Sequence, residues 1–383
     1  MALKLRRLLA LSAVALVGCA ASAAGVTACA TPPQPPPVHA TGPGIGSRGG
    51  LPATPGSARL TLTETGSTLL YPLLRTWAAA YHGKYPNITI TTAPTGSGTG
   101  IADASAGTAD LGASDAFLSS GNLVLDPDLL NVPLAISAQQ INYNLPGLGP
   151  GVHVKLNGAV LARMYSGSIT TWNDPAIAAL NRGVRLPAIR VVPLHRAESS
   201  GDTFLFSSYL STGDPGWNAA IGYGTVVAWP PVPAARAEQG NSGMVAACAV
   251  TRGCVAYVGI SYLTQALAAG LGEAALQNAA GHFVLPDGPS LRAAVASFVP
   301  ATPQNETISM VNGPAAGGYP IVNFEYAIVA ARQRSPAKAR AIKAFLHWVI
   351  TSGNAAGYLG QLRFQPLPAP IVTLADAQIG GIR

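Results

Sequence analysis

Three short segments of the chain combine hydroxyl side chains with glycine, a composition that suits the binding of an anion. They are residues 65–68 (TGST), 96–100 (GSGTG) and 199–201 (SSG). Each joins a short apolar run to a helical pattern, where backbone N–H groups at a helix start are available to an anion. Taken alone, each segment is more simply a connection capped by Ser or Thr. The three together, with Arg196 just before the third, favour an oxyanion pocket.

Asp115 discriminates between the anions that such a pocket could hold. A buried carboxylate beside a bound anion is unfavourable unless the anion carries a proton that it can donate. Hydrogen phosphate has such a proton, whereas fully ionised sulfate does not, and a site that uses a ligand proton can reject the analogue lacking it by about 10⁴ to 10⁵. The alternative is that Asp115 caps a helix. The hydroxyl groups that could donate to the anion are those of Ser67, Thr68, Ser97 and Ser200.

The elements around these segments follow the order of a parallel α/β sheet. Residues 60–62 alternate as a strand that runs into the first segment, and a helix with an apolar stripe at i, i+4 follows it up to about residue 83. The sequence predicts three further strands, at residues 88–90, 110–115 and 191–194. In an open sheet of this kind a ligand lies beyond the carboxyl ends of the strands. The sequence therefore predicts that the three segments meet.

Composition excludes several classes of protein. Of 383 residues 10% are charged and 49% hydrophobic, which excludes disorder as the main state. The formal charge of +7 is spread thinly along the chain, which argues against a nucleic-acid binder. The six histidines are scattered, so we expect neither a metal site nor a cofactor.

The first 18 residues predict a signal peptide. Lys4, Arg6 and Arg7 precede a ten-residue apolar run that is too short to cross a bilayer. The run ends at Cys19, which resembles the acylated cysteine of a bacterial lipobox, with Cys29 as the alternative. Removal of residues 1–18 takes away three positive charges and no negative one, which leaves a net charge of +4.

Residues 19–58 predict a tether between this lipid and the folded part. Its stretch 31–58 holds eight prolines and six glycines, which cannot form a core. No apolar segment of about 20 residues recurs, so we expect the remainder to be soluble on the outer face of the cytoplasmic membrane, anchored only by lipid. In an exported protein Cys248 and Cys254, six residues apart, are most simply a disulfide.

Five motifs together resemble the PstS family of bacterial phosphate-binding proteins, especially its mycobacterial lipoprotein branch. They are TGSTLLYPL from Thr65, TGSGTGI from Thr95, GASDAFLS from Gly112, ITTWNDPAI from Ile169 and HRAESSGDTF from His195. The resemblance covers roughly residue 59 to the end. It implies an α/β venus flytrap of the type II periplasmic-binding-protein kind, in which crossing strands join two lobes. Lobe I would comprise residues 59–136 and 320–383, and lobe II residues 137–319.

The resemblance also implies the ligands, carried over from matching motifs. They are Thr68, the Leu69 backbone N–H, Ser97, Asp115 as acceptor of the phosphate proton, Arg196 as the cation, Ser200 and Gly201. Asp202, the next residue of the third loop, is a further candidate ligand. Asp202 departs from the commoner Ser-Gly-Thr pattern. If its side chain faces the ligand, a second acceptor would favour H2PO4⁻ and weaken binding as pH rises; the alternative is that Asp202 caps the following helix and offers only its N–H.

The resemblance implies a monomer that captures inorganic phosphate, performs no chemistry and delivers the ion to the permease subunits of an ABC importer. Two alternatives come from other classes. One is a surface adhesin that keeps the fold without the ligand. The other is a phosphatase or serine hydrolase that uses His195 with Ser97 or Ser200, although no G-x-S-x-G elbow is present.

Overall fold

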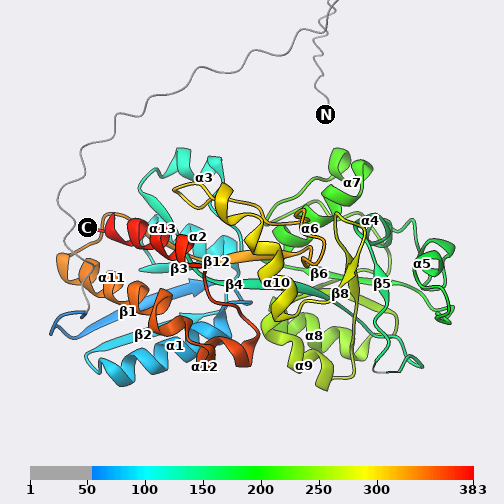
Figure 1. The fold of residues 1–383 in the computed structure, drawn as a ribbon, viewed down its shortest axis with the longest axis horizontal. Helices are drawn as coiled ribbons and strands as arrows, with labels where there is room; N and C mark the ends of the chain where they lie inside the picture. The colour runs from blue at the N-terminus through cyan, green and yellow to red at the C-terminus, as the bar shows by residue number, and fades with distance from the viewer. Residues whose placement is uncertain (1–53, 150) are drawn as a thin grey trace, which may run out of the picture. The chain divides into compact units, whose positions relative to one another are not determined.

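A computed structural model describes residues 54–149 and 151–383, which hold a nine-stranded sheet covered by helices (Figure 1). The strand order is β2-β1-β3-β12-β4-β8-β6-β7, with β9 beside β4. β1 is parallel to β2 and β3, and β6 is parallel to β7 and β8. The antiparallel strands β4 and β12 lie between these two parallel groups. The predicted α/β class is therefore confirmed.

The strands of the large sheet are β1 (Leu60–Gly66), β2 (Ile88–Ala93), β3 (Leu111–Ser114), β4 (Leu129–Tyr143), β6 (Val192–Arg196), β7 (Arg236–Glu238), β8 (Cys254–Gly259), β9 (Gly272–Glu273) and β12 (Val322–Ala330). A second, three-stranded sheet contains β5 (Lys155–Leu156), β10 (Ala275–Gln277) and β11 (Phe283–Val284).

The longer helices are α1 (Tyr71–Lys84), α2 (Ser97–Ala106), α4 (Gly158–Tyr165), α6 (Gly201–Gly213), α8 (Gly240–Val250), α10 (Gly288–Ala296), α11 (Pro336–Ile350) and α13 (Ala369–Gly380). Shorter ones are α3 (Ser120–Leu125), α5 (Pro175–Leu180), α7 (Pro215–Ala220), α9 (Leu263–Ala268) and α12 (Ala356–Leu359), with 3-10 turns η1 (Ile260–Tyr262), η2 (Val299–Ala301), η3 (Ser352–Asn354) and η4 (Gly360–Leu362). No helix of the described residues is both long and apolar enough to cross a membrane.

The long strand β4 links the two halves of the sheet. Its first part pairs with β12, from Leu129 opposite Ala330 to Ala138 opposite Val322. Its last part, from Gln139 to Tyr143, pairs with β8 instead. In Figure 1, β4 and β12 run side by side from the half that holds β1 and α1 towards the half that holds β6 and α6. This is the crossing-strand arrangement of a venus flytrap.

Local sequence explains the elements that lead into the site. α1 has proline in its first turn and buries Leu73, Trp77 and Tyr81, the stripe that the i, i+4 spacing predicts. The predicted stripe of α1 is therefore confirmed. Asp174 caps α5 by accepting a hydrogen bond from the N–H of Ala176 at 2.8 Å, and proline follows it in the first turn.

The disulfide between Cys248 and Cys254 is present. It joins the end of α8 to the start of β8, and its Cα atoms are 5.4 Å apart. Both cysteines are buried, and the bond closes only the short turn between them. Because α8 packs on β8, the disulfide fixes the end of a helix whose first residues reach the candidate site.

Glu306 is a buried carboxyl group without a hydrogen-bond donor among the described residues. Its side chain is 0% exposed, and neither carboxyl oxygen has a partner. Burial raises its pKa to about 9. Between the ordinary pKa of glutamate and about 9 the folded state therefore binds more protons than the unfolded state, so stability decreases as pH rises through this range.

Replacing Glu306 by glutamine should remove this decrease of stability with rising pH. We expect Glu306→Gln to raise the free energy of unfolding by about 2–4 kcal/mol at pH 8 and to change it little at pH 4, where glutamate is neutral in both states. Urea unfolding at the two pH values measures the difference. An equal effect at both would show that Glu306 does not titrate in this environment.

Candidate functional site

The carboxyl ends of β1, β2 and β6 carry the three predicted segments, and the carboxyl end of β3 carries Asp115. β1 ends at Gly66, β2 at Ala93, β3 at Ser114 and β6 at Arg196. The ligands that the sequence predicts lie at these strand ends or within a few residues after them. These residues are all buried: Thr68, Leu69, Ser97, Asp115, Arg196, Ser200, Gly201 and Asp202. A cluster of this size without access to water must satisfy its polar groups internally or through a ligand.

Asp115 lies between the first two segments. Its carboxylate accepts hydrogen bonds from the hydroxyl of Ser67 and, at 3.2 Å, from that of Ser97. Its own N–H donates to Ser97 Oγ at 3.2 Å. Burial, and next the negative charge of Asp202, raise the pKa of Asp115 to about 6. The group is therefore poised to gain or lose a proton near neutral pH.

The third segment meets Asp115 from the other half of the sheet. At Gly201, the first residue of α6, a Cβ atom would lie 2.6 Å from Asp115 Oδ2 and 2.7 Å from Ser97 Oγ. Only glycine allows this approach. The first N–H groups of α6 have no acceptor within the helix, and they are held close to the Asp115 cluster.

Arg196 is the cation of the site. Its Nη1 donates to Asp202 Oδ2 at 2.5 Å, and its Nη2 donates to Thr68 Oγ1 at 2.9 Å and to Glu198. Burial alone would lower the pKa of Arg196, but the charges of Asp202 and Glu198 raise it above its ordinary value. The bond to Thr68 links the two halves of the sheet through the site.

Asp202 does not cap α6. The N-cap residue is Ser200, and α6 has no side-chain cap. The carboxylate of Asp202 instead accepts from Arg196, from Asn241 Nδ2 at 2.7 Å and from Gln139 Nε2 at 3.1 Å. The capping alternative is therefore wrong, because the side chain turns to the arginine; a preference for H2PO4⁻ stays a prediction.

Two predicted ligands carry buried polar atoms without partners among the described residues. They are Arg196 Nε and Ser200 Oγ. Neither α2 nor α6 has a side-chain cap, so the hydroxyls of Ser97 and Ser200 are not used to cap these helices. The carbonyl of Leu69 accepts from Ser261 Oγ at 2.7 Å, while the role of the Leu69 N–H stays a prediction. An oxyanion is the kind of ligand that would satisfy such donors.

Sequence reasoning missed Asn241 and Gln139, which complete the Arg196 network. Asn241 also donates to Thr68 Oγ1 at 2.9 Å. It lies in a fourth segment, QGNSG from residue 239, which joins β7 to α8 and has the same composition as the other three. Gln139 lies on β4, which also contains the polar residues Asn131, Ser137, Gln140 and Asn142. The composition of the fourth segment was therefore a signal for Asn241, whereas the sequence does not set Gln139 apart from its polar neighbours.

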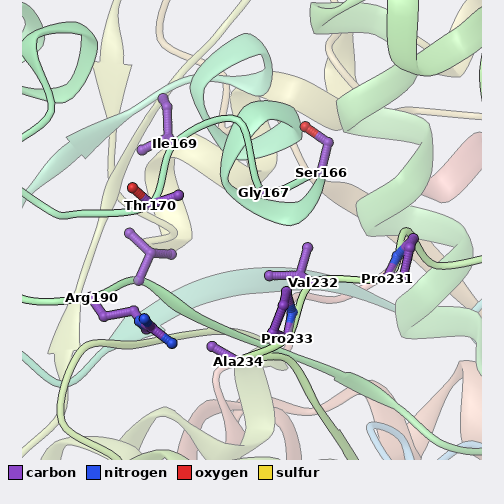
Figure 2. Close-up of a pocket in the computed structure, with 10 residues that line it drawn as sticks. Ser166, Gly167, Ile169, Thr170, Arg190, Pro231, Val232, Pro233 and Ala234 are labelled. Atoms are coloured by element: carbon purple, nitrogen blue, oxygen red, sulfur yellow. The ribbon is translucent and has the colours of Figure 1, made fainter.

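A separate pocket of about 280 Å³ contains none of the predicted ligands. Figure 2 shows that residues 166–170 and 231–234 face each other across it. Arg190, which lines one side, is exposed. Pro231, Val232 and Pro233 make one wall of the pocket apolar, and the pocket lacks the convergent donors of the Asp115 cluster.

Comparison with known proteins identifies the fold and the family. The family model for the PBP superfamily domain matches residues 51–352, so the chain has the fold of a periplasmic binding protein. Phosphate-binding protein PstS from Xylella fastidiosa is 32% identical over 328 residues, which cover 85% of this chain and 87% of the relative. The chain therefore belongs to the PstS family.

Two further similarities are informative. Phosphate-binding protein PstS 3 from Mycobacterium leprae is 31% identical over 346 residues, which cover 86% of this chain and 87% of the relative. The structure of PfluDING, a high-affinity periplasmic phosphate-binding protein bound with phosphate, matches with a TM-score of 0.63 at 20% identity, over 83% of this chain and 93% of that one. The predicted family and the two-lobe flytrap fold are confirmed.

Proposed function

We propose that this protein binds inorganic phosphate in the Asp115 and Arg196 cluster and delivers it to an ABC importer. One observation carries the proposal: buried donors from both halves of the sheet converge on a cluster that contains one carboxylate able to accept a ligand proton. Arg196 supplies positive charge and an Nε donor without a partner among the described residues, Ser200 supplies a hydroxyl that is likewise without one, and α6 supplies N–H groups. The hydroxyls of Ser67 and Ser97 hold Asp115 by donating to it. The names of the relatives and the phosphate bound to PfluDING support the same ligand.

The proposed lobes follow the change of partner along β4. Residues 59–136 and 320–383 would form lobe I, and residues 137–319 lobe II. In support, the first part of β4 pairs with β12, and the part from Gln139 onwards pairs with β8. Thr68, Ser97 and Asp115 would belong to lobe I, and Arg196 with the start of α6 to lobe II. Phosphate would thus be gripped when the lobes come together.

The remaining parts of the proposal rest on the sequence. Cys19, or else Cys29, would carry lipid and hold a monomeric protein at the outer face of the cytoplasmic membrane, beside the permease subunits. Both cysteines lie outside the described residues. The end of the predicted tether does contact the folded part, because Asn87 Nδ2 donates to the carbonyls of Gly56 and Ala58 at 3.0 and 2.8 Å.

The hydrolase alternative has little support in the geometry. The ring of His195 stacks on Trp229 with centroids 4.9 Å apart, and its Nδ1 lies 3.1 Å from the carbonyl of Arg196. Ser200 Oγ has no hydrogen-bond partner among the described residues, and Ser97 Oγ is bonded to Asp115. The hydrolase alternative needs His195 as a base within hydrogen-bond reach of Ser97 or Ser200, and the described residues show no such bond. We therefore propose a binding protein without enzymatic activity.

Isothermal titration with phosphate and with sulfate tests the proposal. A handful of charge-assisted hydrogen bonds at about 1.5–3 kcal/mol each is enough for micromolar binding after the cost of closure. We expect saturable heat with phosphate at pH 7.5 and none with sulfate. Absence of heat with both ions would favour the adhesin alternative, and equal binding of both would contradict the role of Asp115.

A further inference from the structure

Glu325 is a buried carboxyl group directly behind Asp115. It lies on β12 and is 0% exposed. The antiparallel register places Tyr326 opposite Ser114, so the next position along each strand places Glu325 beside Asp115. Each of the two carboxyl groups influences the pKa of the other. The binding of an anion by the cluster described above does not by itself require a second acid here.

The two oxygens of Glu325 differ in their surroundings. Oε1 accepts from Ser137 Oγ at 2.5 Å and from Asn323 Nδ2 at 2.9 Å. Oε2 has no donor among the described residues. If Glu325 were ionised, two buried negative charges would touch and one oxygen would stay unsatisfied. A proton on Oε2 removes the repulsion and gives Asp115 a donor.

We propose that Glu325 is held neutral and donates its Oε2 proton to Asp115, so that it is a positioning residue for the acceptor of the phosphate proton. The inference rests on the proposed function, because only a ligand with a proton makes use of this acceptor. A hydrogen bond donated to a carboxylate favours its ionised form. Glu325 therefore keeps Asp115 charged, and able to accept, at pH values where burial would otherwise protonate it.

The charges around the pair agree with this arrangement. Burial, followed by the charge of Asp115, raises the pKa of Glu325 well above its ordinary value. On its other side Asp115 faces Asp202, which raises its pKa, and Arg196, which lowers it. Tyr326, the neighbour of Glu325 on β12, also has a raised pKa because it is buried. Asp115 is thus the group of the pair that the surroundings favour as the carboxylate.

Hydrogen bonds connect Asp115 and Glu325 to both crossing strands, β4 and β12. A β-bulge separates Glu325 from Tyr326 in the register with β4. Bulges re-aim side chains, and this one coincides with the hydrogen bond from Ser137 of β4 to Glu325. Asn323, also on β12, donates to the backbone carbonyl of Asp115 at 3.1 Å. The strands that join the two halves therefore hold the acceptor in place.

Two substitutions of Glu325 distinguish the effect of its proton from the effect of its packing. In Glu325→Gln the amide N–H can donate to Asp115 while the amide oxygen accepts from Ser137 and Asn323. We expect phosphate and sulfate affinities within about threefold of wild type at pH 7 by calorimetry, since the hydrogen bonds are kept. Glu325→Met fills the space without a donor. Its preference for phosphate over sulfate should fall by about tenfold or more at pH 7, and its sulfate binding should begin at a higher pH.

Glu64 provides the matched control. It is also a buried glutamate of the same sheet, on β1, with a pKa that burial raises well above its ordinary value. Glu64→Gln should change neither the preference nor its pH profile. The proposal would be overturned if Glu325→Gln, Glu325→Met and wild type showed the same preference for phosphate over sulfate. It would also be overturned if the two Glu325 variants lost this preference to the same extent.

Infrared difference spectroscopy tests whether Glu325 carries a proton when no ligand is bound. The spectrum of phosphate-free wild type minus that of Glu325→Gln at pH 7 should contain the carbonyl band of a protonated carboxylic acid. A carboxylate band in its place overturns the inference, even if Glu325→Met does not fold. If wild type binds neither ion, the proposed function fails, and the infrared result still decides whether Glu325 is neutral.

Discussion

Arg196→Ala should weaken phosphate binding by about 10²-fold or more. The side chain is buried, and its N–H groups are distributed between Asp202, Thr68 and Glu198, with Nε left for a ligand. Removing one partner of a buried, hydrogen-bonded charge pair costs about 2–5 kcal/mol. Loss of the guanidinium would also leave two carboxylates that repel an anion. Isothermal titration at pH 7.5 measures the change.

A second variant and a control complete this experiment. Arg196→Lys keeps the positive charge but replaces the planar set of donors by one ammonium group, so we expect affinity between those of Arg196→Ala and wild type. Arg190→Ala removes an exposed arginine from the pocket of Figure 2 and should leave the affinity unchanged. Circular dichroism verifies that each variant is folded. Wild-type affinity in a folded Arg196→Ala protein would exclude Arg196 as the principal cation.

The residues that the sequence predicted to lie close together share one property. Thr68, Ser97, Asp115, Arg196 and Ser200 all lie within a few residues of the end of a strand, where small polar residues follow an apolar run. The geometry of parallel sheets then brings such positions together. Local composition was therefore enough to place them near one another, although their roles as ligands stay a prediction.

The residues that the sequence did not predict have their partners far away in the chain. Ser137 and Glu325 are separated by 188 positions, and Gln139 and Asp202 by 63. Their contacts depend on the register between β4, β12 and α6, and a bulge shifts that register by one residue next to Glu325. A one-residue shift turns a side chain to the opposite face of a sheet. Alternation along a strand therefore could not show that Glu325 faces Asp115.

Asp115→Asn should remove most of the discrimination between phosphate and sulfate. The carboxylate of Asp115 can only accept, and in this cluster the hydroxyls of Ser67 and Ser97 already donate to it. The asparagine oxygen can keep the bond that Oδ1 accepts from Ser67, while the amide group in place of Oδ2 can donate to an anion that has no proton. We expect sulfate to bind the variant and the preference for phosphate to fall by about 10³-fold or more, measured by competition calorimetry at pH 7.5.

The pH dependence of sulfate binding tests the role of Asp115 in a second, independent way. Because burial raises the pKa of Asp115 to about 6, the wild-type carboxylate gains its own proton as pH falls through this value and becomes a donor. Sulfate binding to wild type should therefore appear below about pH 6 and be absent at pH 8, whereas in Asp115→Asn it should be nearly independent of pH. Asp174→Asn, which removes a charge at the cap of α5, where Asn caps equally well, serves as the control. Sulfate rejection by wild type at pH 5 as strong as at pH 8 would mean that a group other than Asp115 excludes the ion.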